Sequence, residues 1–408
     1  MRSCLRTVKH RAACALGLGL LVLGPVSLNP VMAQTRFPGL PAPGGWAGGG
    51  RNAAEGPYAG RPAARVASVA DVAPQAATAR VRASLDAIYR DAAQANSVQL
   101  LDRCIQQCQS IDPNSLDQEA RVYLPQLEAW LLNRRGEAYA LEAGRLMEAD
   151  DSRQSVSMEE RAIEDYSASI SIREGWRAFH NRGVSMAMLG RYDEAIASFG
   201  EAIRLNPNYT NTRFNRAELW LELGKYEEAE QEYGGVLQLD PSDLGARMGR
   251  GHARFYRGQF EAALGDFDDV IKAEPSNAVA FADRADLHAY LGHWELAAQD
   301  YRRAIQLDKS LGRAYQSAAW LMATCPDDRF RDPQLALRSA ERAIQIDGTD
   351  DYRYLDTLAA AQANAQQFNE ALSSLGQAIQ KAPADAAQEL RSRQALYQAS
   401  RPFRDRAR

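Results

Sequence analysis

A 34-residue repeat organises the middle of this chain, from Trp176 to Leu311. Four copies follow one another without a gap and begin at Trp176, Thr210, Leu244 and Ala278. The copies share the same classes of residue at fixed offsets, which the first copy shows as Gly183, Gly190, Tyr192, Ala195, Phe199, Ala202 and Pro207. The fourth copy departs from the pattern only at the last position, where Lys309 replaces the proline. A fixed period of this length is typical of a solenoid, in which identical units stack along one axis.

The pattern inside each copy predicts two helices joined by a tight turn. Ala195, Phe199 and Ala202 lie at i, i+4 and i+7, which is one face of a helix. A glycine stands between the two helical patterns of every copy, where a helix ends in a left-handed residue; these glycines are Gly190, Gly224, Gly258 and Gly292. The small residue eight positions into each copy allows the two helices to approach closely. A single hairpin of this kind cannot bury its apolar face, but a stack can.

The repeat resembles the tetratricopeptide repeat (TPR) family, and the resemblance covers about residues 82–400. It implies an all-α fold: a right-handed superhelical solenoid of antiparallel helix pairs. Within a solenoid at 79–400 we place a degenerate unit at about 82–115, a stretched unit at 129–175, regular units at 176–209, 210–243, 244–277 and 278–311, a unit with an insertion at 312–348, a unit at 352–385 and a C-terminal cap helix. Gln366 replaces the turn glycine of the last unit.

Two insertions and the tail depart from the regular pattern. In the stretched unit we expect a long helix and a polar loop around residues 150–158. The segment Trp320–Pro333, with Ala323-Thr324-Cys325-Pro326-Asp327 at its centre, is similar to a variant repeat of exported bacterial TPR proteins. That variant typically ends in an Arg-Pro-aromatic-Arg stretch, as at Arg401–Arg404. We expect residues 401–408 to be a solvated basic tail.

The N-terminus predicts export from the cytoplasm. Residues 1–33 have a positively charged start, an apolar run and small residues before Gln34, which are the features of a cleaved signal peptide. Residues 34–78 are rich in proline, glycine and alanine and are expected to be a disordered linker. These features predict a secreted protein of the periplasm or cell envelope, with no membrane span after signal cleavage. The alternative is that the segment remains as an N-terminal membrane anchor.

Composition argues against several kinds of chemistry. Acidic residues outnumber basic ones (52 against 48), which disfavours a general nucleic-acid binder. Cys104 and Cys108 lie four residues apart without a further ligand, so we interpret them as core positions and predict no metal and no cofactor. No catalytic signature is present, and the histidines have no partner at fixed spacing. The chain is therefore not expected to be an enzyme.

The resemblance implies a binding groove lined by the first helices of successive units. Transferred onto this sequence, the groove positions include Arg177, His180, Met188, Asn211, Phe214, Glu218, Met248, His252, Phe255, Tyr256, Asp286, Tyr290, Arg313 and Trp320. Such a mixture suits a peptide or partner protein, although some of these aromatics could instead pack between repeats. The family's clamp for carboxylate tails is not expected, because its lysines are missing.

The predicted function is therefore a protein–protein interaction scaffold in the bacterial cell envelope. One alternative is an accessory subunit of an envelope assembly or secretion complex that binds through its convex face or its termini. Another, of a different class, is the regulatory arm of an enzyme.

Overall fold

The computed structural model describes residues 69–95 and 97–405, and only helices, turns and loops occur among them. The predicted signal segment 1–33 and most of the predicted linker lie outside the described residues. Helix α2 already begins at Val69, so the last residues of the segment predicted as linker are helical. That stretch is rich in alanine, the residue with the highest helix propensity, which offsets the single proline within it.

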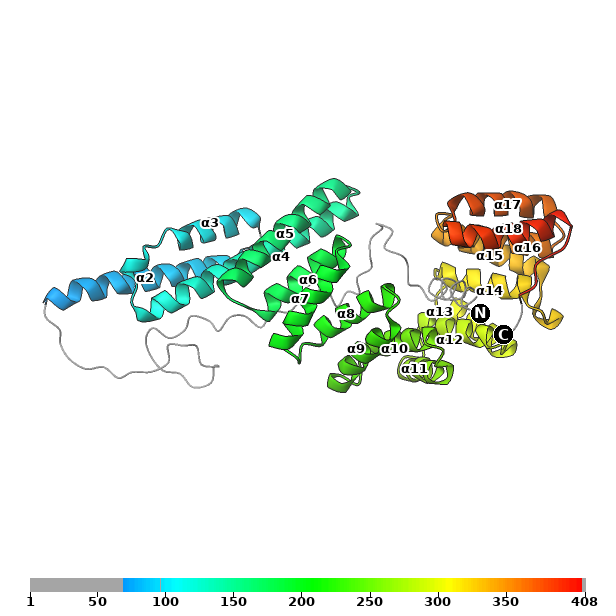
Figure 1. The fold of residues 1–408 in the computed structure, drawn as a ribbon, viewed down its shortest axis with the longest axis horizontal. Coiled ribbons are helices and arrows are strands. Elements are labelled where there is room, and N and C mark those ends of the chain that lie inside the picture. Colours follow the sequence, from blue (N-terminus) through cyan, green and yellow to red (C-terminus); the bar gives the residue numbers. More distant parts are fainter. Residues whose placement is uncertain (1–68, 96, 406–408) are drawn as a thin grey trace. The chain divides into compact units, whose positions relative to one another are not determined.

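The chain divides into two compact units. The described part of the first is residues 69–95 and 97–219, and that of the second is residues 220–405. The N-terminal unit contains α2 (Val69–Gln94), α3 (Val98–Gln109), η1 (Pro113–Ser115), α4 (Gln118–Glu148), α5 (Ser152–Ile172), α6 (Trp176–Met188), α7 (Tyr192–Leu205) and most of α8 (Thr210–Glu222) (Figure 1). The C-terminal unit contains α9 (Tyr226–Leu239), α10 (Leu244–Tyr256), α11 (Phe260–Ala273), α12 (Ala278–Tyr290), α13 (Trp294–Leu307), α14 (Gly312–Thr324), η2 (Asp328–Phe330), α15 (Pro333–Asp347), α16 (Tyr352–Asn364), α17 (Phe368–Lys381) and α18 (Ala384–Gln398).

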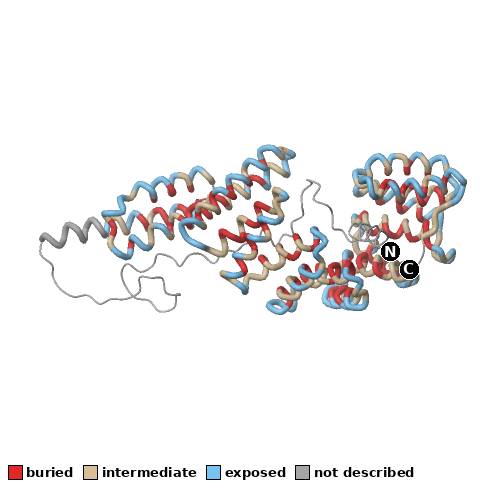
Figure 2. Tube along the Cα trace, viewed as in Figure 1, coloured by how far each residue is buried: buried red, intermediate tan, exposed pale blue. Residues whose placement is uncertain are grey.

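The described residues form an all-α array of helical hairpins. The pairs α6–α7, α10–α11, α12–α13, α14–α15 and α16–α17 each pack along their length, and the second helices α11, α13 and α15 also pack on the first helix of the following pair. Buried residues follow the sides of the helices that face one another within each unit, as Figure 2 shows in red. Within each unit the core therefore lies between successive helices, as expected for a solenoid.

The turns between paired helices have the predicted conformation. Gly190, Gly224, Gly258 and Gly292 have φ between +71° and +78°, the left-handed region that favours glycine. The glycines accept this conformation without a Cβ clash, which ends one helix and starts the next within two residues. Gln366 takes the same conformation at φ +65°, although it is not a glycine.

The stretched unit differs from its predicted form. Helix α4 ends at Glu148 and α5 starts at Ser152, so residues expected in a polar loop are the first turns of α5. Asp151 is the N-cap of α5, and its side chain accepts a hydrogen bond from the backbone N–H of Gln154. The aspartate cap stabilises a helix start at this serine-rich segment. The extra residues therefore lengthen both helices of the hairpin and add no loop.

The C-terminal tail also differs from the prediction. The segment Arg401–Asp405 is held against the last units by hydrogen bonds to α14 and α16. The sequence predicted a solvated tail because it is short and basic. Its contacts depend on residues far away in the chain, which a local pattern cannot reveal.

Candidate binding face

The small residue of each repeat positions the first helix. A Cβ added at Gly183 of α6 would lie 2.7 Å from the Phe199 ring of α7, closer than atoms can approach. Gly251 of α10 has the same relation to Phe267 of α11. Each glycine therefore lets the first helix lie directly against an aromatic ring of its own second helix. The opposite side of the first helix is left for the next unit and, where it is exposed, for a ligand.

His180, a predicted groove residue, is buried in the N-terminal unit. Its Nδ1 lies 2.9 Å from Oγ1 of Thr212, on the first helix of the following unit, and its ring meets Tyr209 edge-on. Burial lowers the pKa of His180 to about 4, so the ring is neutral at physiological pH. His180 and Thr212 therefore join α6 to α8, and His180 presents no positive charge to a ligand.

The other predicted groove residues of this unit are half-buried. They are Arg177, Met188, Asn211, Phe214 and Glu218. The guanidinium of Arg177 lies 4.7 Å from the centroid of the Trp176 ring, which in turn packs on Tyr209 at 4.5 Å. Nδ2 of Asn211 lies 3.3 Å from the hydroxyl of Tyr209 and donates to it. A cation, a carboxylate, an amide and apolar groups are thus held on α6 and α8 with part of their surface open.

In the C-terminal unit, the predicted groove residues His252, Asp286 and Arg313 form a buried polar cluster with Asp283 and Tyr301. Nε2 of His252 is 3.0 Å from one carboxylate oxygen of Asp283, and Nη2 of Arg313 is 2.7 Å from the other. The Tyr301 hydroxyl donates to Asp286 at 2.6 Å. Burial raises the pKa of Asp286 to about 7, and the charge of Arg313 opposes that rise. Since α10, α12 and α14 all contribute, the polar cluster ties consecutive units together.

The predicted aromatic positions pack on one another. Tyr256 stacks on Tyr226 with centroids 4.6 Å apart, and Phe255 meets Tyr290 edge-on at 5.4 Å. Phe255 and Tyr256 are only 7% and 6% exposed, while Tyr290 is half-buried. Packing between repeats thus uses most of the surface of Phe255 and Tyr256, which leaves little of either ring for a partner.

Trp320 and Met248 complete the predicted set, and both are half-buried. Nε1 of Trp320 donates to Oδ2 of Asp405 at 3.0 Å, and its ring lies 5.9 Å from that of Phe403. The chain's own C-terminal segment therefore lies on this predicted groove residue. The predicted residues lie on the first helices, as expected, but they differ in environment. Some are buried and join repeats, others are half-buried, and Trp320 is in contact with the C-terminal segment.

Sequence reasoning missed an arginine that recurs at the seventh position of each regular unit: Arg182, Arg216, Arg250 and Arg284. Arg250 binds Asp266 on its own second helix through two hydrogen bonds, at 3.1 and 2.6 Å. Arg284 binds Asp300 in the same way, at 2.8 Å for both bonds. The spacing of 34 residues was the signal that could have revealed these pairs.

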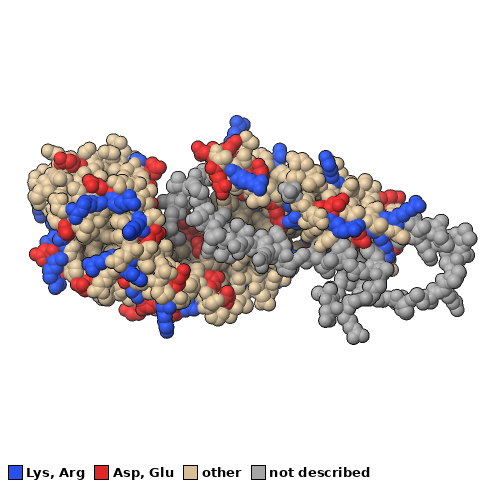
Figure 3. Space-filling view, turned by 180° about the vertical axis from the view of Figure 1, so that it is seen from behind, with Lys and Arg blue, Asp and Glu red and all other residues tan. Residues whose placement is uncertain are grey.

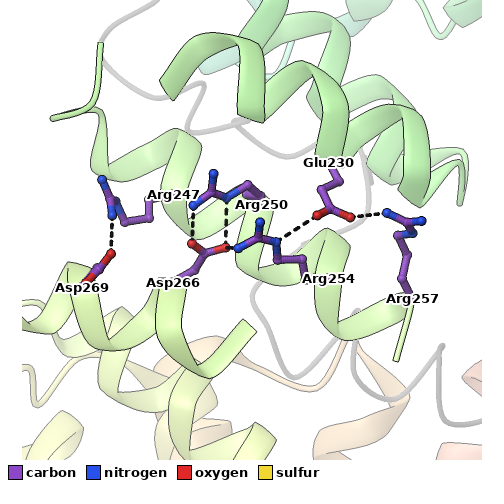
Figure 4. A network of polar contacts seen from close by, with 7 residues as sticks. All are labelled: Glu230, Arg247, Arg250, Arg254, Arg257, Asp266 and Asp269. Carbon is purple, nitrogen blue, oxygen red and sulfur yellow. Dashed lines mark hydrogen bonds and ion pairs between the residues drawn. The ribbon is translucent and has the colours of Figure 1, made fainter. Parts of the chain in front are cut away.

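The arginines of the third unit are part of a wider network. It consists of Glu230, Arg247, Arg250, Arg254, Arg257, Asp266 and Asp269 (Figure 4). Arg254 bridges Asp266 at 2.9 Å and Glu230 at 2.9 Å, so each carboxylate meets two arginines. Both signs of charge are also interspersed on the surface that Figure 3 shows. The arginines of the third unit are therefore paired with carboxylates and do not form an open site for anions.

No group of three or more His, Cys, Asp or Glu side chains that could hold a metal ion occurs among the described residues. Cys104, Cys108 and Cys325 are buried free thiols, which agrees with the core positions expected for the first two. The Nδ1 atoms of His288 and His293 lie 3.4 Å apart at an exposed position. Within residues 69–405, no helix is long and apolar enough to cross a bilayer.

Two family models match the chain where the repeats are most regular. Both are described as tetratricopeptide repeats, and they cover residues 187–253 and 248–320. The chain contains tetratricopeptide repeats. The helical hairpins, the left-handed turn glycines and the small residue at the helix contact are thus the features of TPR units. A search of curated proteins finds no match to the chain.

Several solved structures are similar to parts of the TPR array. Yeast Tom70 is 16% identical, with a TM-score of 0.45, and the match covers 74% of this chain but only 59% of Tom70. A tetratricopeptide repeat protein from Parabacteroides merdae is 14% identical over 77% of this chain and 99% of its own, with a TM-score of 0.41. YrrB, described as a TPR protein with an unusual peptide-binding site, is 22% identical over 44% of this chain and 90% of its own, with a TM-score of 0.37. All three scores are below 0.5, so the assignment depends on the family models and the helical pairs.

Proposed function

We propose that this protein is a non-enzymatic scaffold that binds a peptide or partner protein on the first helices of its TPR units, in the bacterial cell envelope. TPR arrays generally mediate protein–protein interaction. The observation that carries the proposal is the half-buried set on α6 and α8: Arg177, Met188, Asn211, Phe214 and Glu218. The buried contact between His180 and Thr212 joins the two helices that carry these side chains, so their backbone is held in place before a ligand arrives.

The half-buried set has the chemistry of a protein interface. It combines an aromatic ring, a methionine, an arginine, an amide and a carboxylate, and interface cores are enriched in the first three. Because the helices are already packed, binding requires little ordering of the backbone, and less of the binding free energy is lost. Recognition by such a face needs no bond-making step.

A photo-crosslinking residue placed at Phe214 tests this proposal. We expect it to capture a discrete partner from envelope fractions, while the same residue at Ala197, an exposed position of the second helix α7, captures none. Purified partner should then bind the Phe214→Ala/Glu218→Ala variant about tenfold more weakly, with an unchanged circular dichroism spectrum. Equal capture at both positions would place the binding surface elsewhere.

The location in the envelope rests on the N-terminal sequence. Its positive start, short apolar run and small residues before Gln34 are the features that export machinery and signal peptidase recognise. The variant segment around Cys325 supports the same bacterial class. We expect the protein purified from its source to begin at Gln34 and to occur in the periplasmic fraction. A cytoplasmic protein that retains Met1 would contradict export.

A further inference from the structure

The C-terminal segment Arg401–Asp405 lies on the chain's own first helices. Ser400 ends α18 in the left-handed conformation, with φ +54°, and its N–H donates to the carbonyl of Tyr397. The N–H of Arg401 then donates to the carbonyl of Leu396 at 2.9 Å. These bonds turn the chain back from α18 toward α14 and α16, whose ends it reaches within a few residues.

Arg404 and Asp405 donate hydrogen bonds to backbone carbonyls at the end of α14 that have no partner within the helix. The last carbonyls of a helix have no N–H of the next turn to accept from, and they attract cations. Nη1 of Arg404 donates to the carbonyl of Ala323 at 2.9 Å, and the N–H of Asp405 donates to that of Thr324 at 2.8 Å. Nη2 of Arg404 also donates to Oδ1 of Asn364 on α16, at 2.9 Å. A single guanidinium thus joins two first helices.

Phe403 and Asp405 contact the aromatic part of the same surface. Phe403 packs against the apolar cluster of the last unit, and its ring lies 5.9 Å from that of Trp320. The buried guanidinium of Arg393 lies 5.2 Å from the Trp320 centroid and 5.1 Å from that of Phe403. The carboxylate of Asp405 accepts from Nε1 of Trp320. The surface on α14, α16 and α18 therefore recognises an aromatic residue followed by arginine and aspartate.

We infer that Arg401–Asp405 is an intramolecular ligand that occupies the C-terminal end of the binding face. A partner that engages Trp320 must first displace it. That regulatory role rests on the proposed function, whereas the docking of the segment does not. The bonding groups belong to three helices from different units, so the docked segment also links the end of the array to α14.

A peptide added in trans tests the docking. We expect a fluorescent peptide of residues 401–408 to bind protein truncated after Ser400. It should bind the full chain at least about tenfold more weakly, because the attached segment competes for the same surface. Peptides with Phe403→Ala or Asp405→Ala should lose most of this binding. Equal binding to both proteins, or none to a truncated protein with unchanged helicity, would overturn the inference.

Limited trypsin digestion of the full chain gives a second measurement if truncation unfolds the last units. The peptide bond after Arg404 should be cut slowly in the wild type, and about tenfold faster in the Asp405→Ala variant, which loses the bond to Trp320. Cutting at equal rates would contradict a docked segment. Both experiments use only this chain, so they can succeed even where capture at Phe214 fails, and the two proposals are tested separately.

Discussion

The third unit and the last unit have the same hairpin but different means of holding it. Gly258 in the third unit and Gln366 in the last occupy the same turn position, with φ +77° and +65°. The hydrogen bonds of the turn also match, since Gln259 N–H donates to Arg254 and Gln367 N–H donates to Gln362, each at 2.9 Å. A residue without glycine's freedom therefore takes the glycine conformation. Packing of the two helices imposes the turn, and glycine only makes it less costly.

Their charged residues differ in burial. In the third unit, Arg250 pairs with Asp266 while keeping part of its own surface in water. In the last unit, Arg393 of the cap helix is 2% exposed and pairs with Asp356, which is 8% exposed. In the third unit the guanidinium of the pair thus stays partly hydrated, although the Asp266 carboxylate is buried. The end of the array is instead closed by a buried ion pair, an aromatic contact and the docked segment.

The largest effect on stability is expected from substitution of the alanine that occupies the same repeat position in both units. Ala263 and Ala371 are fully buried where the two helices of their hairpins cross. Ala263→Arg should cost roughly 5 kcal/mol or more of unfolding free energy, because no space exists for a long charged side chain. Ala371→Arg should disrupt the last unit and leave the preceding repeats helical. Thermal melts followed at 222 nm check this, and a wild-type melting curve for Ala263→Arg would contradict the repeat register.

The buried ion pair gives the next effect. Asp356→Leu leaves the charge of Arg393 buried with only Glu389 nearby, and should cost about 3–5 kcal/mol. Asp266→Leu in the third unit should cost about 1 kcal/mol, because Arg250 and Arg254 can turn toward water. Urea denaturation measures both. The double variant Asp356→Leu/Arg393→Met should recover much of the loss, and a loss equal to the single variant's would exclude an uncompensated charge as the cause.

The stretched unit is expected to show a pH effect on stability through Glu159. Burial raises the pKa of Glu159 on α5 to about 7, above its usual 4.5, and its Oε2 has no hydrogen-bond partner among the described residues. A raised folded-state pKa favours the fold fully below pH 4.5, and this contribution is lost as pH rises through 7.

Glu159→Gln removes the ionisable carboxyl and therefore the loss of stability that its ionisation causes as pH rises. The stability of the variant relative to wild type should therefore grow by about 3 kcal/mol between pH 4 and pH 8. Urea denaturation across this range measures it, with the exposed neighbour Glu160→Gln as the control. A difference independent of pH would show that Glu159 ionises normally in the fold.

The smallest effect returns to the turn. Gln366→Gly should stabilise the last unit by about 1 kcal/mol, and Gly258→Gln should destabilise the third by a similar amount, because only glycine enters the left-handed region without strain. Native-state hydrogen exchange of α16–α17 and α10–α11 would report each change locally. Changes of the same sign in both variants would show that side-chain contacts, and not backbone strain, dominate these turns.

The regular units were predictable because the same residue pattern occurs in four successive copies. The alanines, aromatics and turn glycines at fixed offsets predicted the helical pairs, and the structure confirms the turns and the close contact of Gly183 with Phe199. The binding face was predicted as a set of positions only. Whether Phe255 faces a ligand or a neighbouring ring depends on the tilt between units, to which the pattern within one unit is insensitive.

The stretched unit and the tail show where a local pattern fails. Ser152–Ser157 was interpreted as a loop from its polarity, yet a cap at Asp151 and packing against α4 make it helical. The tail was interpreted as solvated from its charge, yet it finds carbonyls that α14 leaves open. Polarity describes what a residue can bind, and only the fold supplies the partner.

By itself, the sequence determined the period, the helical hairpins, the turn positions and the class of protein, because these depend on spacings of at most one repeat. The tertiary structure decided which groove positions are buried, which arginines pair across a hairpin, and where the C-terminus lies. Those outcomes join residues from different units, such as His252 with Asp283 or Trp320 with Asp405. Such contacts depend on how one unit is placed on the next, which the offsets within a repeat do not specify.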